Sequence, residues 1–449
     1  HGWNKSTRVS HRPPRRRMPS PLLPLILLLP HGAAAVNKAV ARIRGATAAN
    51  PVSGWVVFEQ DESDPLADVT VRVNVSGLSV GEHGFHVHQF GDSRVTKNLS
   101  TFGAHFVPFC IPPDVPINGS ATADDCQKDA THGLPPSEWR QPGDMGNVLV
   151  TGTAPVVLTL VLGQQKMSLT DPLRSIVGRT VVFHSLRDDG SQPYGNTGDP
   201  EAYGMIGMKR PDDGATNSAL APTVPKVDKV ICTFQGAYPG VPLTGPDVRG
   251  SAILQLMEPE RPGIVRMRAR LEGLSKGNTH SFHFHTWGDM TVAFTDLGSI
   301  YSANSIYVDS ISVNSPTGVA FYQAEYSADS LLQHVGRSLT IHAGGDSSSP
   351  TISAAVCGLA NPRATLDLTG SPFAEGDEAP MSGGVLLLVV VTVIVVSAFL
   401  GTAVLYFMRV PIPFCGRCLY VDMIALSPPP PPPQGHYADQ GKYGSAQRA

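Results

Sequence analysis

The feature of this chain that most constrains its fold is a unit of strand and paired histidines that occurs twice. Residues 69–75 and residues 265–271 alternate apolar and polar side chains without a break, which is the period of a strand with one buried face. Each stretch leads into Gly-Leu-Ser and then into a His-X-His motif, at residues 86–88 and at residues 283–285. Short alternating strands between Gly- and Pro-rich turns predict an all-β fold, with a sandwich or barrel in each copy.

The paired histidines predict metal sites. Side chains at positions i and i+2 of a strand point to the same face, so His86 and His88 can reach one ion. A further histidine, His184, ends a later apolar segment of the first copy. Imidazole suits copper and zinc. The second copy repeats the arrangement with His283, His285 and His342.

The chain is long enough for two domains and a membrane anchor. We place the domains at residues 37–210 and 226–360, joined by a linker rich in Pro, Asp and Ala. The 449 residues include 45 Gly and 40 Pro but only 16% charged side chains, and the net charge is −3. This composition suits a turn-rich β protein and gives no reason to expect nucleic acid as a partner.

Two apolar segments set the expected topology. Residues 1–35 combine an N-terminal extension, a basic stretch, a short apolar core and small residues, as a secretory signal peptide does. Residues 385–408 follow a stalk at residues 361–384 and are uncharged and long enough to span a bilayer. Arginines come after this transmembrane helix, so residues 409–449 are expected to be a disordered cytoplasmic tail. We therefore expect a single-pass type I protein of the cell membrane with a large extracellular region.

The tail contains one candidate interaction motif. Residues 428–433 are consecutive prolines, which form a polyproline II rod. Such a rod binds SH3- or WW-type domains, and an unstructured spacer is the equal alternative.

Cysteines and sequons agree with an oxidising exterior. Cys110 and Cys126 bracket a single loop, so they are candidates for one disulfide. Cys232 and Cys357 lie near opposite ends of the second domain and are candidates for another. Buried thiols are the alternative for either pair. Sequons mark candidate glycosylation sites at Asn74, Asn98 and Asn118.

With these motifs, both repeats resemble copper/zinc superoxide dismutase over nearly all of the outer region. The first repeat has the family's pieces in order, within residues 84–92, 103–106, 132–148 and 182–190. The tandem arrangement and the anchor are most similar to membrane-anchored copper-only superoxide dismutase repeat proteins. The resemblance implies an eight-stranded Greek-key β-barrel for each repeat, with copper as the cofactor.

The resemblance also implies the roles of individual residues. In the first repeat the copper ligands would be His86, His88, His105 and His184. These histidines would also be the catalytic groups that convert superoxide to dioxygen and hydrogen peroxide, with His105 bridging the metals and supplying a proton. In the second repeat Ile300 stands at the bridging position. The candidates for a second copper site are therefore His283, His285 and His342.

The zinc site and the position of a family arginine depart from the family pattern. The family's zinc ligands correspond to His105, His132, Asp144 and a fourth histidine, but the fourth position is Gln141. A glutamine amide is a poor zinc ligand, which makes zinc doubtful and favours a loop clasp for His132 and Asp144. The arginine that attracts superoxide corresponds to Pro200, so a lower rate is expected.

Three functional interpretations follow. The leading one is a cell-surface, copper-dependent superoxide dismutase-like enzyme with catalysis in the first repeat. The second is a copper-binding or copper-handling surface protein with little turnover. The third is a non-catalytic adhesion or receptor module that keeps the barrels for shape alone. Metal content separates the third from the other two, and a dismutase assay separates the first from the second.

Overall fold

The computed structural model describes most of the two predicted domains. The described residues are 36–47, 49–94, 101–108, 128–163, 166–171, 173–211, 227–236, 246–301, 310–313, 318–328 and 330–368. All of them fall in one compact unit of the chain. Apart from a helical turn at residues 128–130 and the 3-10 turn η2 (Leu332–His334), their regular structure is β.

The described strands divide into two sets of eight. The first set is β1 (Val36–Gly45), β2 (Ser53–Asp61), β3 (Val69–Ser76), β4 (Gly81–His88), β5 (Asp144–Val150), β6 (Val156–Leu162), β7 (Thr180–His184) and β8 (Pro200–Met208). The second set is β9 (Lys229–Gln235), β10 (Arg249–Leu256), β11 (Ile264–Glu272), β12 (Thr279–His285), β13 (Ser310–Ser312), β14 (Ala320–Ser327), β15 (Ser338–His342) and β16 (Thr351–Leu359).

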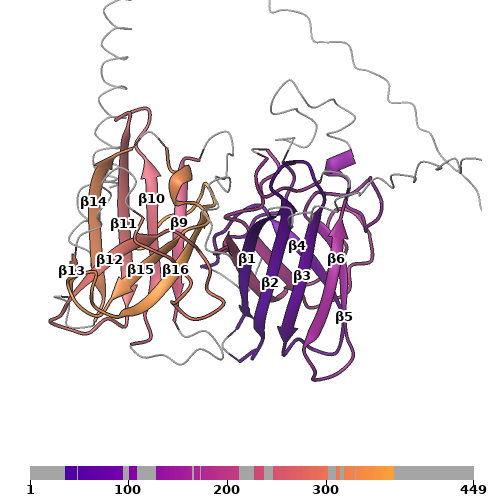
Figure 1. The fold of residues 1–449 in the computed structure, drawn as a ribbon, viewed down its shortest axis with the longest axis horizontal. Helices are drawn as coiled ribbons and strands as arrows, with labels where there is room; N and C mark the ends of the chain where they lie inside the picture. The colour runs from indigo at the N-terminus through magenta and orange to yellow at the C-terminus, as the bar shows by residue number, and fades with distance from the viewer. Residues whose placement is uncertain are drawn as a thin grey trace, which may run out of the picture. The chain divides into compact units, whose positions relative to one another are not determined.

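Each set forms an antiparallel sheet (Figure 1), and the two sheets have the same strand order. The order is β5-β4-β7-β8-β1-β2-β3-β6 in the first sheet and β13-β12-β15-β16-β9-β10-β11-β14 in the second, so each strand matches the one eight places earlier. Because β3 pairs with β6 and β4 pairs with β7, connections cross between the two sides of the sheet in a Greek-key pattern. Each sheet is a nearly closed barrel, and the prediction of two all-β barrels is confirmed for the described residues.

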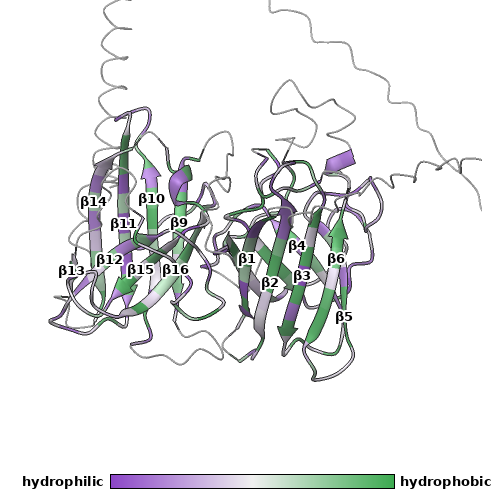
Figure 2. Cartoon of the chain, in the orientation of Figure 1, coloured by the Kyte–Doolittle hydropathy of each residue, from purple (hydrophilic) through white to green (hydrophobic). Residues whose placement is uncertain are grey.

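The core follows from the alternation seen in the sequence. Along β3 the residues Val69, Val71, Val73 and Val75 are buried, and the residues between them are less so. The corresponding strand β11 buries Val265, Met267, Ala269 and Leu271 in the same way. Hydrophobic and hydrophilic residues therefore share each of these strands (Figure 2). One face of each strand fills the barrel, which leaves loops and strand ends to build a site.

A disulfide joins two neighbouring strands of the second barrel. Cys232 on β9 is opposite Cys357 on β16, and the two sulfurs are bonded. This confirms the predicted pairing and excludes buried thiols. The corresponding positions of the first barrel hold Ala41 and Ile206, which are also opposite each other. The second barrel is thus cross-linked at a point where the first relies on apolar packing.

Several predicted features lie outside the described residues. They are the signal segment, the expected transmembrane helix and tail, the end of the stalk, Cys110, Cys126, Asn98 and Asn118. In the part of the chain that is described, no helix combines the length and the apolar character needed to cross a bilayer. Asn74 is described, and it lies half-buried on the outward face of β3.

Candidate metal centre

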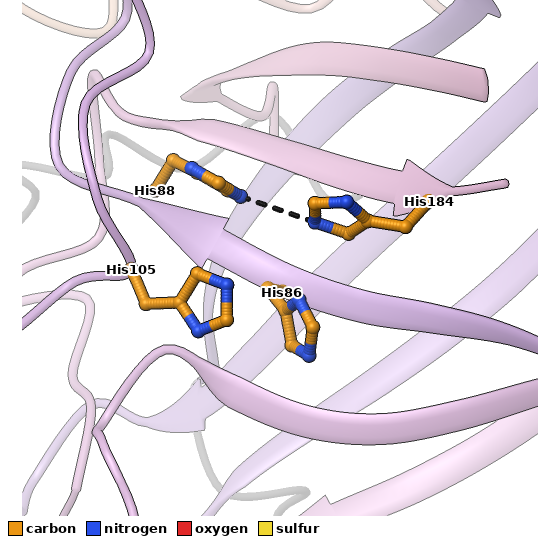
Figure 3. A group of neighbouring side chains, drawn as sticks. All are labelled: His86, His88, His105 and His184. Carbon is orange, nitrogen blue, oxygen red and sulfur yellow. Dashed lines mark hydrogen bonds between the residues drawn. The ribbon is translucent and has the colours of Figure 1, made fainter. Parts of the chain in front are cut away.

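Four histidines from three segments of the first barrel meet at one point (Figure 3). His86 and His88 lie on β4, and His184 ends the adjacent strand β7. His105 lies in a loop whose backbone forms an isolated bridge with His88. One ring nitrogen of each residue lies within 4.8 Å of those of the others, and each residue is at most 1% exposed. The predicted copper residues therefore form one buried group that could hold a metal.

Hydrogen bonds decide which nitrogens of His88 and His184 are free. His88 Nδ1 donates to the Gly103 carbonyl at 2.9 Å, and His184 Nδ1 donates to the Gly198 carbonyl at 3.1 Å. A carbonyl only accepts, so both Nδ1 atoms carry a proton. Burial lowers the pKa of His184 to about 4 and the pKa of His88 well below its usual value. Both rings are therefore neutral at pH 7, and their Nε2 lone pairs face each other at 3.3 Å.

Carboxylates hold the other two rings. His86 Nε2 donates to Asp188 Oδ2, and His105 Nδ1 donates to Asp144 Oδ1, each at 2.8 Å. Burial and the neighbouring histidines lower the pKa of His86 well below its usual value. The remaining nitrogens, His86 Nδ1 and His105 Nε2, are buried without a hydrogen-bond partner. Both of these atoms belong to the rings that converge with His88 and His184.

The donor set fits copper. Buried polar atoms without partners cost free energy, and a cation would satisfy two orphaned nitrogens and two facing lone pairs together. Each of the four rings also has its second nitrogen hydrogen-bonded, as is usual for histidines that bind metals. Neutral imidazoles accommodate both Cu(II) and Cu(I). The geometry supports a metal site, and copper as its occupant stays a prediction.

Asp188 is a central residue of this site, and its role is not apparent from the sequence. Its Oδ2 accepts from His86, and its Oδ1 accepts from His132 Nε2 at 2.9 Å. The Asp188 backbone N–H donates to the Asn147 side chain, which fixes the loop after β7. The Asp-Asp-Gly run after His184 is the sequence feature that could have pointed to Asp188. It does not show which imidazole rings the Asp188 carboxylate reaches.

Replacing Asp188 with asparagine should weaken copper binding by roughly 10–100-fold, the range for losing a carboxylate behind a ligating histidine. An amide cannot accept hydrogen bonds from both His86 and His132. The measurement is a copper titration of metal-free protein against a competing chelator. Asp189→Asn is the matched control, because Asp189 is exposed and bonds within its own turn. Equal affinities for the two variants would contradict this role of Asp188.

The predicted zinc residues form a second group. His105, His132 and Asp144 are buried, and their ligating atoms lie within 4.8 Å of one another. His132 Nδ1 is 2.9 Å from Asp144 Oδ2, although the two are not aligned as a hydrogen bond. Gln141 is beside them: its backbone N–H donates to Asp144 at 3.2 Å, and its Oε1 is buried without a partner. Three strong donors and one amide fit structural zinc incompletely, so low zinc occupancy stays our prediction.

Without a metal, His132 connects Asp144 and Asp188. Burial by itself would lower the pKa of His132, but the close contact with Asp144, the hydrogen bond to Asp188 and the negative charge of both carboxylates raise it to about 9. Burial would raise the pKa of Asp144, but His105 and His132 hold it at about 2. At pH 7 an imidazolium therefore lies between two carboxylates and offsets their charge. This contact is the loop clasp expected from the sequence.

The clasp predicts that the metal-free protein loses stability at alkaline pH. Because the folded pKa of His132 is about 9 and the unfolded value is 6.5, its proton stabilises the fold fully below pH 6.5. That stabilisation, at most about 3 kcal/mol, is lost as the pH rises through 9. Urea unfolding in chelator at pH 6.5 and pH 9.5 measures it. His132→Gln should reduce the difference between the two pH values, and an unchanged difference would argue against the clasp.

The second barrel keeps its histidines on the corresponding strands. His283 and His285 lie on β12, and His342 ends β15. His285 forms its isolated bridge with Ile300, as the corresponding bridge of the first barrel reaches His105. The Nε2 atoms of His283 and His285 are buried without partners. Among the described residues, however, these three histidines do not form a group whose ligating atoms all lie within 4.8 Å. A second copper site stays a prediction.

The fold and this site define a β-barrel with a buried cluster of four histidines that could hold a metal ion. Residues 52–206 match the family model of copper/zinc superoxide dismutase (SODC). The matched region runs from just before β2 into β8 and contains the four histidines, both carboxylates and His132. The first barrel is therefore similar to this family in sequence.

Proposed function

We propose that this chain is a cell-surface, copper-dependent superoxide dismutase-like protein with its active site in the first barrel. The observation that carries the proposal is the convergence of four imidazole nitrogens, two of them orphaned and two facing each other. The match of residues 52–206 supports superoxide as the substrate. Bound copper would supply one-electron chemistry, so that one superoxide is oxidised to dioxygen and another is reduced to hydrogen peroxide.

The protein's own residues would hold the ion and handle the proton. His86, His88 and His184 are fixed in one tautomer by Asp188 and two backbone carbonyls, which keeps their lone pairs directed inward. His105 is suited to carry a proton at Nε2, because Asp144 accepts its Nδ1–H and stabilises the resulting imidazolium. The proton needed for peroxide can therefore be held next to the ion.

The test is to load the purified full chain with copper, count copper and zinc per chain, and measure superoxide consumption. We expect about one copper held by the first barrel, little zinc, and catalysis above that of free copper under the same chelating conditions. A chain that retains no stoichiometric copper, or that retains copper but does not accelerate superoxide loss, would overturn the proposal. Those two outcomes also separate an adhesion module from a copper-handling protein.

One observation favours the copper-handling alternative. Pro200 is buried at the start of β8 opposite His184 and brings no charge to the site. The nearby Arg187 is exposed, and its Nε lies 3.1 Å from Glu82 Oε2, so its positive charge is partly offset. Weak local attraction for an anion lowers the encounter rate without removing electron transfer. For such a site we expect a low rate of superoxide consumption that falls little when salt is added.

The proposed location rests on the sequence and on one structural feature. The Cys232–Cys357 disulfide suits an oxidising exterior. Residues 385–408 would anchor the chain, and the Pro-rich tail would be available to an SH3- or WW-type domain. Surface biotinylation of intact cells, with glycosidase treatment for Asn74, Asn98 and Asn118, tests the orientation. Labelling only after the cells are opened would count against it.

A further inference from the structure

The backbone contacts between the two barrels occur in matched pairs. Gly91 N–H donates to the Leu359 carbonyl at 2.8 Å, and Gly288 N–H donates to the Met208 carbonyl at 3.0 Å. Gly91 and Gly288 each stand three residues after the second histidine of their motif, and Met208 and Leu359 end the corresponding strands β8 and β16. The first barrel therefore donates to the second through the same kind of hydrogen bond that the second barrel donates to the first.

A second pair of hydrogen bonds follows the same rule. Leu359 N–H donates to the Gly178 carbonyl at 2.8 Å, and Met208 N–H donates to the Gly336 carbonyl at 2.7 Å. Reciprocal contact of equivalent residues is the pattern of a twofold interface between like subunits. An apolar cluster adds to the same interface, formed by Met205 of the first barrel with Met290, Phe294, Leu297, Ala354 and Val356 of the second.

Glycines make the close backbone approach feasible. A Cβ on Gly358 would lie 2.6 Å from the Gly178 carbonyl oxygen and 2.9 Å from the Gly91 Cα. The corresponding Cβ on Gly207 would lie 2.7 Å from the Gly288 carbonyl oxygen. A side chain at either position would force the two backbones apart, because real Cβ atoms do not approach backbone oxygens so closely.

This interface adjoins the copper-ligand segments of the first barrel. Gly91 follows His88 by three residues, and the intervening Gln89 N–H donates to the Ala104 carbonyl at 2.9 Å. Ala104 immediately precedes His105. Within residues 89–91, Gly91 is therefore bonded to β16 of the second barrel. Residues 89 and 90 are bonded to the segment that leads to His105. In addition, Gln235 of β9 donates to the Ser93 hydroxyl at 2.7 Å.

We infer that the second barrel is a permanently attached partner subunit of the first. Its strands β16, through Gly91, and β9, through Ser93, position residues 89–93 and, through them, His88 and His105. Because both barrels are on one chain, the interface does not dissociate on dilution as a dimer of separate chains would. The effect on copper rests on the function proposed above, whereas the effect on residues 89–93 does not.

The test compares the metal-free full chain with its Gly358→Val variant by hydrogen–deuterium exchange. Gly358 is in the second barrel, and the atoms nearest its Cβ belong to the first. We expect amides of residues 89–93 to exchange at least about 10-fold faster in the variant, because the Gly91 bond that ties this segment to β16 is lost. Gly152→Val is the control, since a Cβ on Gly152 meets nothing within 4 Å. Unchanged exchange of residues 89–93 in Gly358→Val would overturn the inference.

If Gly358→Val does not fold, a second variant tests the same inference. Gln235→Ala removes the side-chain bonds to Ser93 and one side-chain bond from Arg44, and it leaves both cores intact. Faster exchange at residues 91–94 is the expected result, and unchanged exchange there overturns the inference.

A copper measurement separates this inference from the proposed function. In the copper-loaded full chain we expect the Cu(II) electron paramagnetic resonance spectrum of Gly358→Val to differ from that of the wild type, with the Gly152→Val spectrum unchanged. An identical spectrum despite faster exchange would overturn the positioning of His88 and His105 by β16. If the wild type itself binds no copper, the proposed function fails, and the exchange experiment alone decides whether β16 holds residues 89–93.

Discussion

The His184→Ala variant should lose tightly bound copper and superoxide turnover together. His184 supplies one of the two lone pairs that face each other at 3.3 Å, and its ring is held by the Gly198 carbonyl. Removing a ligand should cost more than the roughly 10–100-fold in metal affinity that follows loss of a residue behind a ligand. Copper content after dialysis against a chelator, and superoxide consumption per bound copper, are the two measurements.

The second barrel provides the matched control for this variant. His342 ends β15 as His184 ends β7, so His342→Ala removes the corresponding ring from the barrel that lacks a bridging histidine. We expect superoxide turnover to survive in His342→Ala. Equal turnover in wild type and His184→Ala would show that the four histidines are not the reacting centre. Equal loss in both variants would show that catalysis does not belong to the first barrel alone.

Removing the Cys232–Cys357 disulfide should lower the free energy of unfolding of the second barrel by about 2–5 kcal/mol. The bond closes a loop with a sequence separation of 125 residues, and long loops lose the most unfolded-state entropy when they are closed. Urea unfolding of the oxidised wild type and of a cysteine-free variant measures the difference. Near-equal midpoints would mean that strand pairing between β9 and β16 already accounts for the stability.

The first barrel suggests the best cysteine-free variant. Its corresponding positions are Ala41 and Ile206, opposite each other on adjacent strands, so Cys232→Ala with Cys357→Ile copies a packing that a barrel of this topology tolerates. The double variant removes the bond while it refills the core, which separates loop entropy from a cavity. Single variants would leave an unpaired buried thiol and would be harder to interpret.

Local periodicity explains why much of the fold could be predicted. The alternation along β3 and β11 depends only on which neighbouring side chains are apolar, and a strand with one buried face needs that pattern wherever it lies. The His-X-His pairs are predictable for the same reason, because i and i+2 share a face of any strand. Repetition of both features predicted two domains with the same kind of β fold.

Contacts between distant segments could not be predicted in the same way. The Asp-Asp-Gly run after His184 is visible in the sequence, but only the folded loop brings Asp188 within hydrogen-bond distance of both His86 and His132. The free nitrogen of each imidazole likewise depends on its carbonyl or carboxylate partner, such as Gly103 for His88. The sequence also left the state of Cys232 and Cys357 open, and strand pairing decided it.

By itself, the sequence determined the β class, the repeat and the paired histidines of the candidate metal site, because these follow from side-chain spacing along single strands. Tertiary structure alone decided that four rings converge with their lone pairs inward and that His132 lies between two carboxylates. It also decided that β16 bonds to the segment after His88. Each of these depends on distances between segments far apart in the chain, which are set only when the whole barrel is packed.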